Sequence, residues 1–408
     1  MRLANKRFCS GCSACYAACP NHAISMEADG EGFLYPQIKT SDCVDCGICK
    51  KVCPVLHQEE SRLPLSVYAA RANDEGVRMK SSSGGIFSLI AQRTLSHGGA
   101  VFGAAFDEND WHVYHRCVDD EVGLCKLRGS KYAQSDIGNS FADVARELRN
   151  GREVLFSGTP CQVAGLRRYL SIVRGVPTDR LYLIDVVCHA VSSPLVWKKY
   201  MELRVASEYK GLACDLSRIV RVSFREKKYG WKKFFMTMEF ANGSRYEKAF
   251  SEDLFFRGFL FELYNRPSCH NCSSRGLRSG SDMTIGDFWG VDSIIPELDD
   301  DKGVSLILVN TKKGIAVQNY LMDRCKSRKT EYSLACRGNP VIIGSKRPNF
   351  RRRKFFASMR QFGFESAVHK CLRRSVIQAI GSLFFRATRL LLEMTKRALH
   401  HAKDIKCN

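Results

Sequence analysis

The chain has 408 residues, of which 63 are Lys or Arg and 42 are Asp or Glu, so its net charge is +21. This length allows two or three domains, while the absence of eighteen consecutive apolar residues and of an apolar leader predicts neither a membrane-spanning helix nor a secretory signal. Nineteen cysteines without an export signal favour a protein of the reducing cytoplasm over a disulfide-rich secreted one.

Two cysteine runs near the N-terminus share the spacing C-x2-C-x2-C-x3-C-P, which is the bacterial ferredoxin spacing for [4Fe–4S] clusters. They are Cys9, Cys12, Cys15 and Cys19 before Pro20, and Cys43, Cys46, Cys49 and Cys53 before Pro54. In two-cluster ferredoxins the fourth cysteine of each run binds the other cluster. We therefore expect residues 1–62 to form a two-cluster domain in which Cys53 joins the first run and Cys19 joins the second. Zinc is disfavoured, because zinc sites use separated C-x2-C pairs.

Beyond residue 62 the pattern alternates between strands and helices, which indicates a mixed α/β core over residues 63–344. Expected strands are 67–70, 101–106, 112–118, 154–156, 181–187 and 304–309, with a meander at 222–224, 234–240 and 245–250. Expected helices are 86–95, 141–148, 163–170 and a segment that ends near residue 322. The segment 181–187 is almost wholly apolar, as expected for a strand covered on both faces.

Four core cysteines have features of metal ligands. Cys161 and Cys188 follow consecutive apolar strands, so they share one sheet edge if those strands are parallel. Cys269 and Cys272 have a two-residue spacing in a polar segment. The residues alone leave two interpretations open, because a single buried cysteine often serves only as a small hydrophobe. Seven others lack ligand spacing and are expected to be ordinary: Cys117, Cys125, Cys214, Cys325, Cys336, Cys371 and Cys407.

Five core motifs occur in an order that resembles one known family. They are SSGG at 82–85, GSKYAQS at 129–135, GTPCQVAGL at 158–166, the pair Cys269 and Cys272, and GDFWG at 286–290. Over roughly residues 65–340 the chain resembles the beta subunits of coenzyme F420-reducing hydrogenases and dehydrogenases. It departs from them at Ala190, where relatives usually have glycine after the Cys-His pair. The family reduces several unrelated substrates, so the resemblance does not identify one.

The resemblance implies a third [4Fe–4S] cluster and a flavin, expected to be FAD. The cluster would be held by Cys161, Cys188, Cys269 and Cys272. The expected flavin contacts combine a helix N-terminus suited to a pyrophosphate, a cation and an aromatic ring; they are Ser82, Ser83, Gly84, Gly85, Ser130, Lys131, Tyr132, Thr159, Pro160, Gln162 and Asp287. His189 is the one candidate catalytic residue, as a proton donor, although a hydrogen bond to a cluster sulfur or to the loop is its favoured role.

Residues 345–408 are predicted to form a basic, helical C-terminal tail, with 16 Lys or Arg against 3 acidic residues. From Leu372 onward, apolar residues recur at helical spacing and basic residues occupy the other face. Such a helix either lies on an anionic membrane surface or a partner, or closes the core with a solvated basic face. We expect no nucleic-acid partner, because no recognition fold accompanies the basic run at 351–354.

Together these features predict a cytoplasmic iron–sulfur flavoprotein oxidoreductase, peripheral at the inner membrane face if the tail binds lipid. Electrons would pass from a ferredoxin-type donor through the clusters to the flavin and on to an organic substrate. Bacterial relatives with the same fusion suggest a substrate from surface-polysaccharide synthesis. Two alternatives remain open: an electron-transfer subunit that serves a partner enzyme, and an F420-dependent oxidoreductase.

Overall fold

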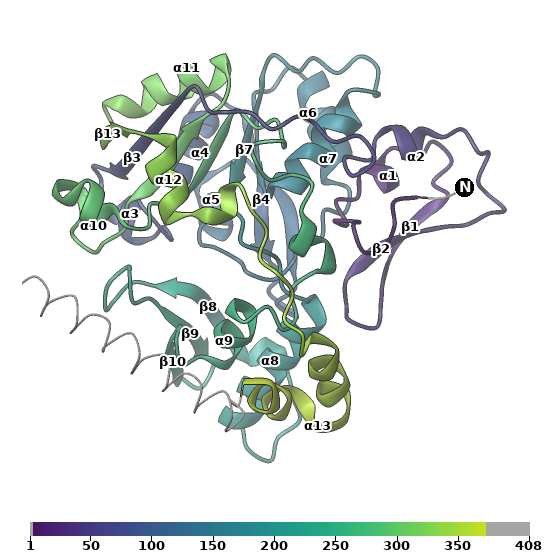
Figure 1. The fold of residues 1–408 in the computed structure, drawn as a ribbon, viewed down its shortest axis with the longest axis vertical. Helices are drawn as coiled ribbons and strands as arrows, with labels where there is room; N and C mark the ends of the chain where they lie inside the picture. The colour runs from purple at the N-terminus through teal and green to yellow at the C-terminus, as the bar shows by residue number, and fades with distance from the viewer. Residues whose placement is uncertain (1–2, 373–408) are drawn as a thin grey trace, which may run out of the picture.

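The computed structural model describes residues 3–372 (Figure 1). The amphipathic stripe predicted beyond Leu372 lies outside these residues, as does Cys407. Within the described part, no helix is both long enough and apolar enough to cross a membrane.

Residues 3–62, here called the N-terminal module, project from one side of the molecule (Figure 1). The module contains an antiparallel pair, β1 (Ile24–Ala28) and β2 (Leu34–Ile38), and two four-residue helices, α1 (Ala14–Ala17) and α2 (Ile48–Lys51). Each helix contains the third cysteine of one run, so a short helix lies near the end of each run. The module therefore consists mainly of two cysteine loops joined by one hairpin.

The core is built on an eight-stranded mixed sheet in the order β13-β3-β12-β11-β7-β6-β4-β5. Four neighbouring strands are parallel: β4 (Ala100–Phe106), β6 (Val154–Gly158), β7 (Leu181–Val186) and β11 (Met283–Asp287). The others run antiparallel to their neighbours: β3 (Ser66–Ala72), β5 (Val113–Val118), β12 (Ser305–Val309) and β13 (Cys325–Thr330). The predicted mixed α/β class is thus confirmed.

Helices cover both faces of this sheet. One face packs against α4 (Ile86–Ser96), α5 (Glu121–Leu127) and α11 (Lys312–Met322). The other face packs against α6 (Ser140–Arg149) and α7 (Pro160–Leu170). Cys12, Ala14 and Val52 join this second cluster, so the N-terminal module docks beside α7. The short helices α3 (Glu75–Met79), α10 (Val291–Ile294) and α12 (Tyr332–Gly338) lie near the antiparallel strands.

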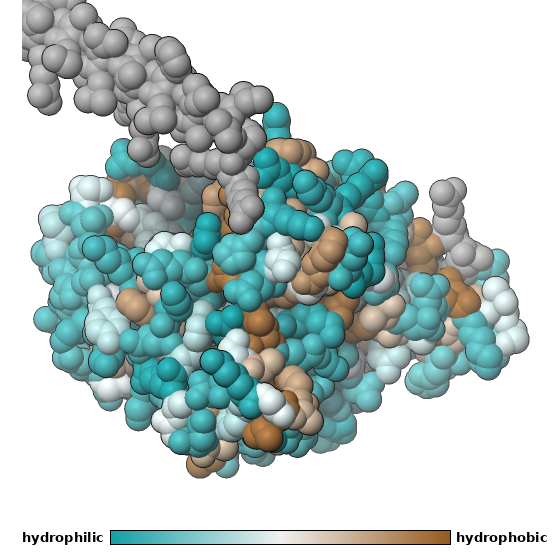
Figure 2. All heavy atoms as spheres, turned by 90° about the horizontal axis from the view of Figure 1, so that it is seen from below, coloured by the Kyte–Doolittle hydropathy of each residue, from teal (hydrophilic) through white to brown (hydrophobic). Residues whose placement is uncertain are grey.

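A second lobe lies below the sheet in Figure 1. It contains the meander β8 (Ile219–Glu226), β9 (Phe235–Phe240) and β10 (Arg245–Ala249), with helices α8 (Pro194–Glu208), α9 (Leu254–Leu260) and α13 (Arg352–Leu372). Phe355, Phe356 and Phe364 of α13 are buried in its aromatic cluster. Residues 352–372, which the sequence had assigned to a separate tail, therefore pack within this lobe. Seen from below, apolar residues are scattered over a largely hydrophilic face (Figure 2).

Most predicted elements occur close to their expected positions. The strands β11 and β13 and the helices α8 and α9 were not predicted. β13 has the sequence CKSRKT, and such a polar edge strand lacks the apolar alternation on which a sequence prediction depends.

Candidate iron–sulfur centres

The eight N-terminal cysteines regroup across their two runs. Cys9, Cys15 and Cys53 are close enough to interact electrostatically: burial, followed by the charges of Cys9 and Cys53, raises the pKa of Cys15 to about 12. Burial also raises the pKa of Cys12, and the same three cysteines add to it. On the other side of the module, Cys19 shares a pocket with Cys43, Cys46 and Cys49. The fold thus places the fourth cysteine of each run with the other run.

The spacing of the sulfur atoms bears on which metal fits. None of the cysteines in the described residues forms a disulfide. A tetrahedral zinc site holds its sulfurs about 3.8 Å apart, since Zn–S bonds are about 2.3 Å long. Among described residues, the only group of three or more metal-ligating side chains whose atoms all lie within 4.8 Å of one another is Asp107, Asp110 and His112. No set of three cysteines in the described residues meets that 4.8 Å limit.

The four core cysteines come from three segments and meet at one sheet edge. Strands β6 and β7 are parallel, with Gly158 opposite Asp185, so Cys161 at the start of α7 and Cys188 after β7 lie side by side. Cys269 lies in the short 3-10 helix Pro267–Asn271, and Cys272 follows it. All four line one pocket.

The pKa values of these core thiols show how close together they are. Burial, followed by the charge of Cys272, raises the pKa of Cys161 to about 11 and that of Cys269 to about 12. Burial, followed by Cys269 and Cys161, raises the pKa of Cys188. Four thiolates this close repel one another, and a bound metal centre would remove that repulsion.

The N-terminal module reaches this pocket directly. Phe8 and Ser10 form part of its lining. One helical turn after Cys161, Gly165 packs against Cys12 so closely that a Cβ atom at Gly165 would lie 3.0 Å from the Cys12 sulfur. The set that contains Cys12 and the set that contains Cys161 therefore lie against the same helix, α7.

Two buried arginines flank the core cysteines and have no carboxylate partner among the described residues. Arg266 is 1% exposed; its Nε donates to Cys9 O (3.0 Å), its Nη1 to Gln134 Oε1 (2.7 Å) and its Nη2 to Leu34 O (2.9 Å). Arg275 donates from Nη1 to Cys188 O (3.0 Å) and from Nη2 to His189 O (2.7 Å).

Buried charges are costly unless paired. The anionic partners in reach are the cysteines: Arg266 favours the thiolates of Cys161 and Cys269, and Arg275 favours that of Cys188. The sequence analysis missed both arginines. Their positions in the sequence, three residues before Cys269 and three residues after Cys272, could have indicated a role beside these cysteines.

His189, the candidate proton donor, lines the same pocket but its ring is engaged elsewhere. Its Nε2 lies 2.6 Å from Oε1 of Glu262, a buried residue with a left-handed φ of +58°. Asn265 also donates to the Glu262 carboxylate, and the His189 ring lies against Phe259. The contacts of His189 thus join the cysteine pocket to the second lobe.

Several predicted flavin contacts meet at two residues that the sequence analysis did not select, Arg225 and Lys227. Arg225 Nη1 donates to the Asp287 carboxylate (2.7 Å) and to the Tyr132 hydroxyl (3.2 Å). Lys227 Nζ donates to Ser83 O (3.0 Å). Ser82 Oγ accepts from the N–H of Ser130 (2.7 Å). Segments far apart in the chain therefore converge where β8 reaches the sheet. The signal was two basic residues shortly after the predicted strand 222–224.

These residues nevertheless already pack against, or form hydrogen bonds with, other parts of the protein, so they do not form an open site for a phosphate group. A Cβ at Gly84 would lie 2.5 Å from Ala70 O, so glycine is needed there for packing. Gly85 has a φ of +93° and begins α4. The Lys131 ammonium donates to three backbone carbonyls at the end of α5, each 3.0 Å away, which uses all of its donors. Thr159 bonds Gln162 where Pro160 begins α7. As arranged, this set does not fit a flavin pyrophosphate.

Three family models match the chain. A 4Fe-4S dicluster domain matches residues 8–56, and the coenzyme F420 hydrogenase/dehydrogenase beta subunit matches with its N-terminal model over residues 67–141 and its C-terminal model over residues 151–332. The chain belongs to this beta-subunit family. The resemblance expected from the sequence motifs is thereby confirmed, together with the 4Fe-4S character of the N-terminal module.

Among solved structures, one similar chain comes from a study titled "Xenon derivatization of the F420-reducing [NiFe] hydrogenase complex from Methanosarcina barkeri". It is 15% identical, with a TM-score of 0.47, and the alignment covers 74% of the present chain and 94% of that chain. A search of curated proteins gave no match.

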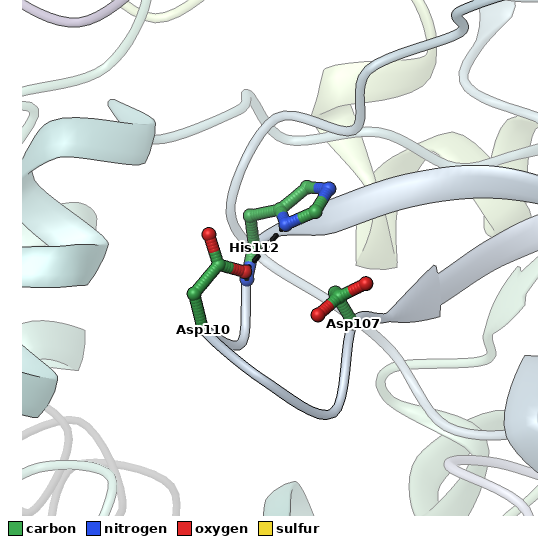
Figure 3. Close-up of side chains that lie close together, drawn as sticks. All are labelled: Asp107, Asp110 and His112. Atoms are coloured by element: carbon green, nitrogen blue, oxygen red, sulfur yellow. Dashed lines mark hydrogen bonds and ion pairs between the residues drawn. The ribbon is translucent and has the colours of Figure 1, made fainter. Parts of the chain in front are cut away.

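A small group of acidic residues and a histidine lies in a turn that contains no cysteine. Asp107, Asp110 and His112 lie on the loop between β4 and β5, where His112 Nδ1 is 2.5 Å from Asp110 Oδ1 (Figure 3). The group is largely exposed. His115, three residues further along the chain, is buried, and its Nδ1 lies 2.6 Å from Ser135 Oγ.

Proposed function

We propose that this protein transfers electrons between its N-terminal dicluster module and a third [4Fe–4S] cluster held by Cys161, Cys188, Cys269 and Cys272. One observation carries the proposal. Four cysteines from three distant segments line a single pocket whose wall also includes Phe8 and Ser10 of the module. A pocket of four thiols that only filled space would need neither this convergence nor two buried arginines beside it.

The residues around the pocket suit a bound cluster. A [4Fe–4S] centre supplies one-electron chemistry and carries net negative charge with its four thiolates. Arg266 and Arg275 offset such charge and hold the backbone of Cys9 and Cys188 in place. Gly165 lets Cys12 approach α7 one turn, or about 6 Å along the helix axis, from Cys161.

Iron analysis of the full-length protein tests this proposal. Anaerobically prepared protein should contain about twelve irons, four for each of three clusters. The double variant Cys161→Ser/Cys272→Ser should contain about eight. The exposed Cys214 supplies the matched control, because Cys214→Ser should leave iron content unchanged. Wild-type protein with about eight irons, or a double variant that keeps all of them, would show that the third cluster is wrong.

A second candidate function is a flavin-dependent reduction of an organic substrate. Its support is the meeting of three predicted flavin segments at Arg225 and Lys227, two buried basic residues. A bound flavin would have to replace some of the hydrogen bonds that these segments now make with each other. Equilibrium binding of FAD, FMN and F420 to the anaerobic protein tests it. Stoichiometric binding of one of them would support a reductase and name its cofactor class. Binding of none would leave an electron-transfer subunit that serves a partner enzyme.

A further inference from the structure

A second pocket lies between the N-terminal module and the core, on the flank of α7. No cysteine lines it, so it is distinct from the core cysteine pocket, although it begins one residue after Cys53 and one after Cys272. About 460 Å³ of space, counted out to open solvent, lies between three segments. The polar side chains that line it include Glu59, Arg167, Arg168, Ser273, Ser274 and Arg278.

Two of its three arginines have most of their donors unused. Arg167 makes one hydrogen bond, from Nη1 to Ser279 O at 3.4 Å, and Arg278 makes one, from Nη1 to Arg275 O at 3.4 Å. Neither pairs with an acidic residue in the described part of the chain. A guanidinium carries five N–H donors. Two groups with several free donors each thus line the same pocket.

The third arginine, Arg168, differs from the other two because its contacts join two segments of the protein. Arg168 forms an ion pair with Glu59 (3.3 Å) and donates to His57 O (2.7 Å), so it ties the segment after Cys53 to α7. Arg167 is exposed and has no such partner among the described residues, but its guanidinium lies directly over the backbone of Gly280. Gly280 has a φ of +76°, and a Cβ atom there would lie 1.7 Å from Arg167 Nη1. Any side chain at position 280 would displace this guanidinium.

The rest of the lining is also suited to an anion. Ser273 and Ser274 make no side-chain hydrogen bond to a described residue, and Ser274 is only 3% exposed. Three guanidinium groups face one carboxylate, Glu59, which is already paired. Arg62 lies close enough that Arg167, after burial, helps to lower its pKa. Among the lining residues, arginines therefore outnumber carboxylates by three to one.

We propose that this pocket binds the phosphate group of a small phosphorylated molecule through Arg167, Arg278, Ser273 and Ser274. Guanidinium groups bind phosphate with paired N–H bonds. A phosphate offers enough oxygen atoms for two guanidinium groups and two hydroxyls, whereas a carboxylate offers two. The pocket is lined by the residues that directly follow Cys53 and Cys272, but binding there does not depend on the proposed electron transfer.

Calorimetric titration of the full-length, anaerobically prepared protein with inorganic phosphate and pyrophosphate, at fixed ionic strength, tests the site. Arg167→Gln and Arg278→Gln should each weaken binding at least about tenfold, the usual value of a hydrogen-bonded charged group. Arg337→Gln is the matched control, because Arg337 is exposed and lies outside the pocket. Ser274→Ala should weaken binding less, because it removes one neutral donor.

Parallel titrations with organic phosphates show whether the bound group is free phosphate or part of a larger molecule. AMP and glucose 1-phosphate that bind more tightly than inorganic phosphate would identify an organic phosphate, whereas equal affinities would identify free phosphate. Iron is counted in every sample, so loss of phosphate binding at normal iron content is assigned to the pocket. The proposal is overturned if wild-type protein binds no probe up to about 10 mM, or if both arginine variants bind like the control.

Discussion

The N-terminal module and the core cysteine site bring cysteines together in opposite ways. In the module, eight cysteines lie within residues 9–53, on two short helices and the loops on either side of them. In the core, four cysteines spread over residues 161–272 meet because β6 and β7 are parallel and a loop folds back over their ends. The module is organised around its cysteines, whereas the core site is an addition to a sheet that packs without it.

The apolar content of the two regions supports this distinction. The module buries few large apolar side chains, chiefly Phe33, Tyr35, Ile24 and Val52. A region of about sixty residues with so small a core generally needs metals or disulfides to fold. The core sheet instead has extensive hydrophobic clusters on both faces. The two regions should therefore respond differently to loss of iron.

The largest expected effect follows from removing iron from the whole protein. Anaerobic chelation should unfold residues 3–62 while the eight-stranded sheet stays folded, because only the module depends on metal for its core. Hydrogen exchange measured by mass spectrometry checks this, since amides of β1 and β2 should lose protection and those of β6 and β12 should keep it.

The double variant Cys161→Ser/Cys272→Ser provides the reciprocal control. It removes two core thiolates and leaves all eight module cysteines in place, so protection in β1 and β2 should be retained. Protected module amides after complete chelation would contradict the distinction between the two regions.

A second prediction concerns Arg266, which contacts both regions. Arg266→Gln should lower the midpoint potential of the nearest clusters, because a buried positive charge that favours the reduced, more anionic state is lost. It should also destabilise the protein by about 3 kcal/mol, since three acceptors in Cys9, Leu34 and Gln134 lose a charged donor. Redox titration followed by electron paramagnetic resonance measures the first effect, and urea denaturation the second.

Arg266→Lys separates charge from geometry. Lysine keeps the charge but cannot reproduce the forked contacts of a guanidinium. The potential should then return towards the wild-type value while stability stays low. Equal potentials in wild type and Arg266→Gln would mean that the cysteines are not the anionic partner of this arginine.

The same difference between local and long-range organisation determined how much of each region could be predicted from the sequence. The crossed grouping of the module cysteines follows from local spacing, and the motif order identified the family. The parallel strands before Cys161 and Cys188 were also recognisable as apolar runs. Arg225, Lys227, Arg266 and Arg275 were not, because burial of a charged side chain depends on tertiary contacts that no local pattern records. Likewise, α13 was assigned to a basic tail, since its first two buried phenylalanines come directly after the basic run at 351–354.

A smaller effect is expected at Asp185, at the bottom of the core pocket. Burial raises the pKa of this carboxyl to about 6, against the hydrogen bonds from Ser279 and Thr284. The folded state therefore binds the proton more tightly than the unfolded state, and stability falls as pH rises from about 4 to about 6. The full penalty, about 2–3 kcal/mol, should apply at neutral pH.

Asp185→Asn should remove this dependence, so the variant should gain stability relative to wild type between pH 5 and 7.5. Urea denaturation at several pH values in this interval checks the difference. Contributions from iron loss are common to both proteins and cancel. A constant difference across the interval would show that Asp185 is not protonated at the lower pH.

The smallest effect is expected from one methyl group between the two cysteine sets. Gly165→Ala places a Cβ atom 3.0 Å from both Cβ and Sγ of Cys12, closer than ordinary contact, so α7 and the module must separate by a few tenths of an ångström. Alanine is favoured over glycine inside a helix by about 1 kcal/mol, which largely offsets the strain. Thermal stability should therefore change little, whereas electron exchange between the two sets should slow, because electron tunnelling weakens steeply with distance. Freeze-quench spectroscopy of the reduced protein measures that rate. The control is Gly30→Ala, at a position without a left-handed φ and with nothing within 4 Å of the added atom. An unchanged rate in Gly165→Ala would mean that electrons do not cross at α7.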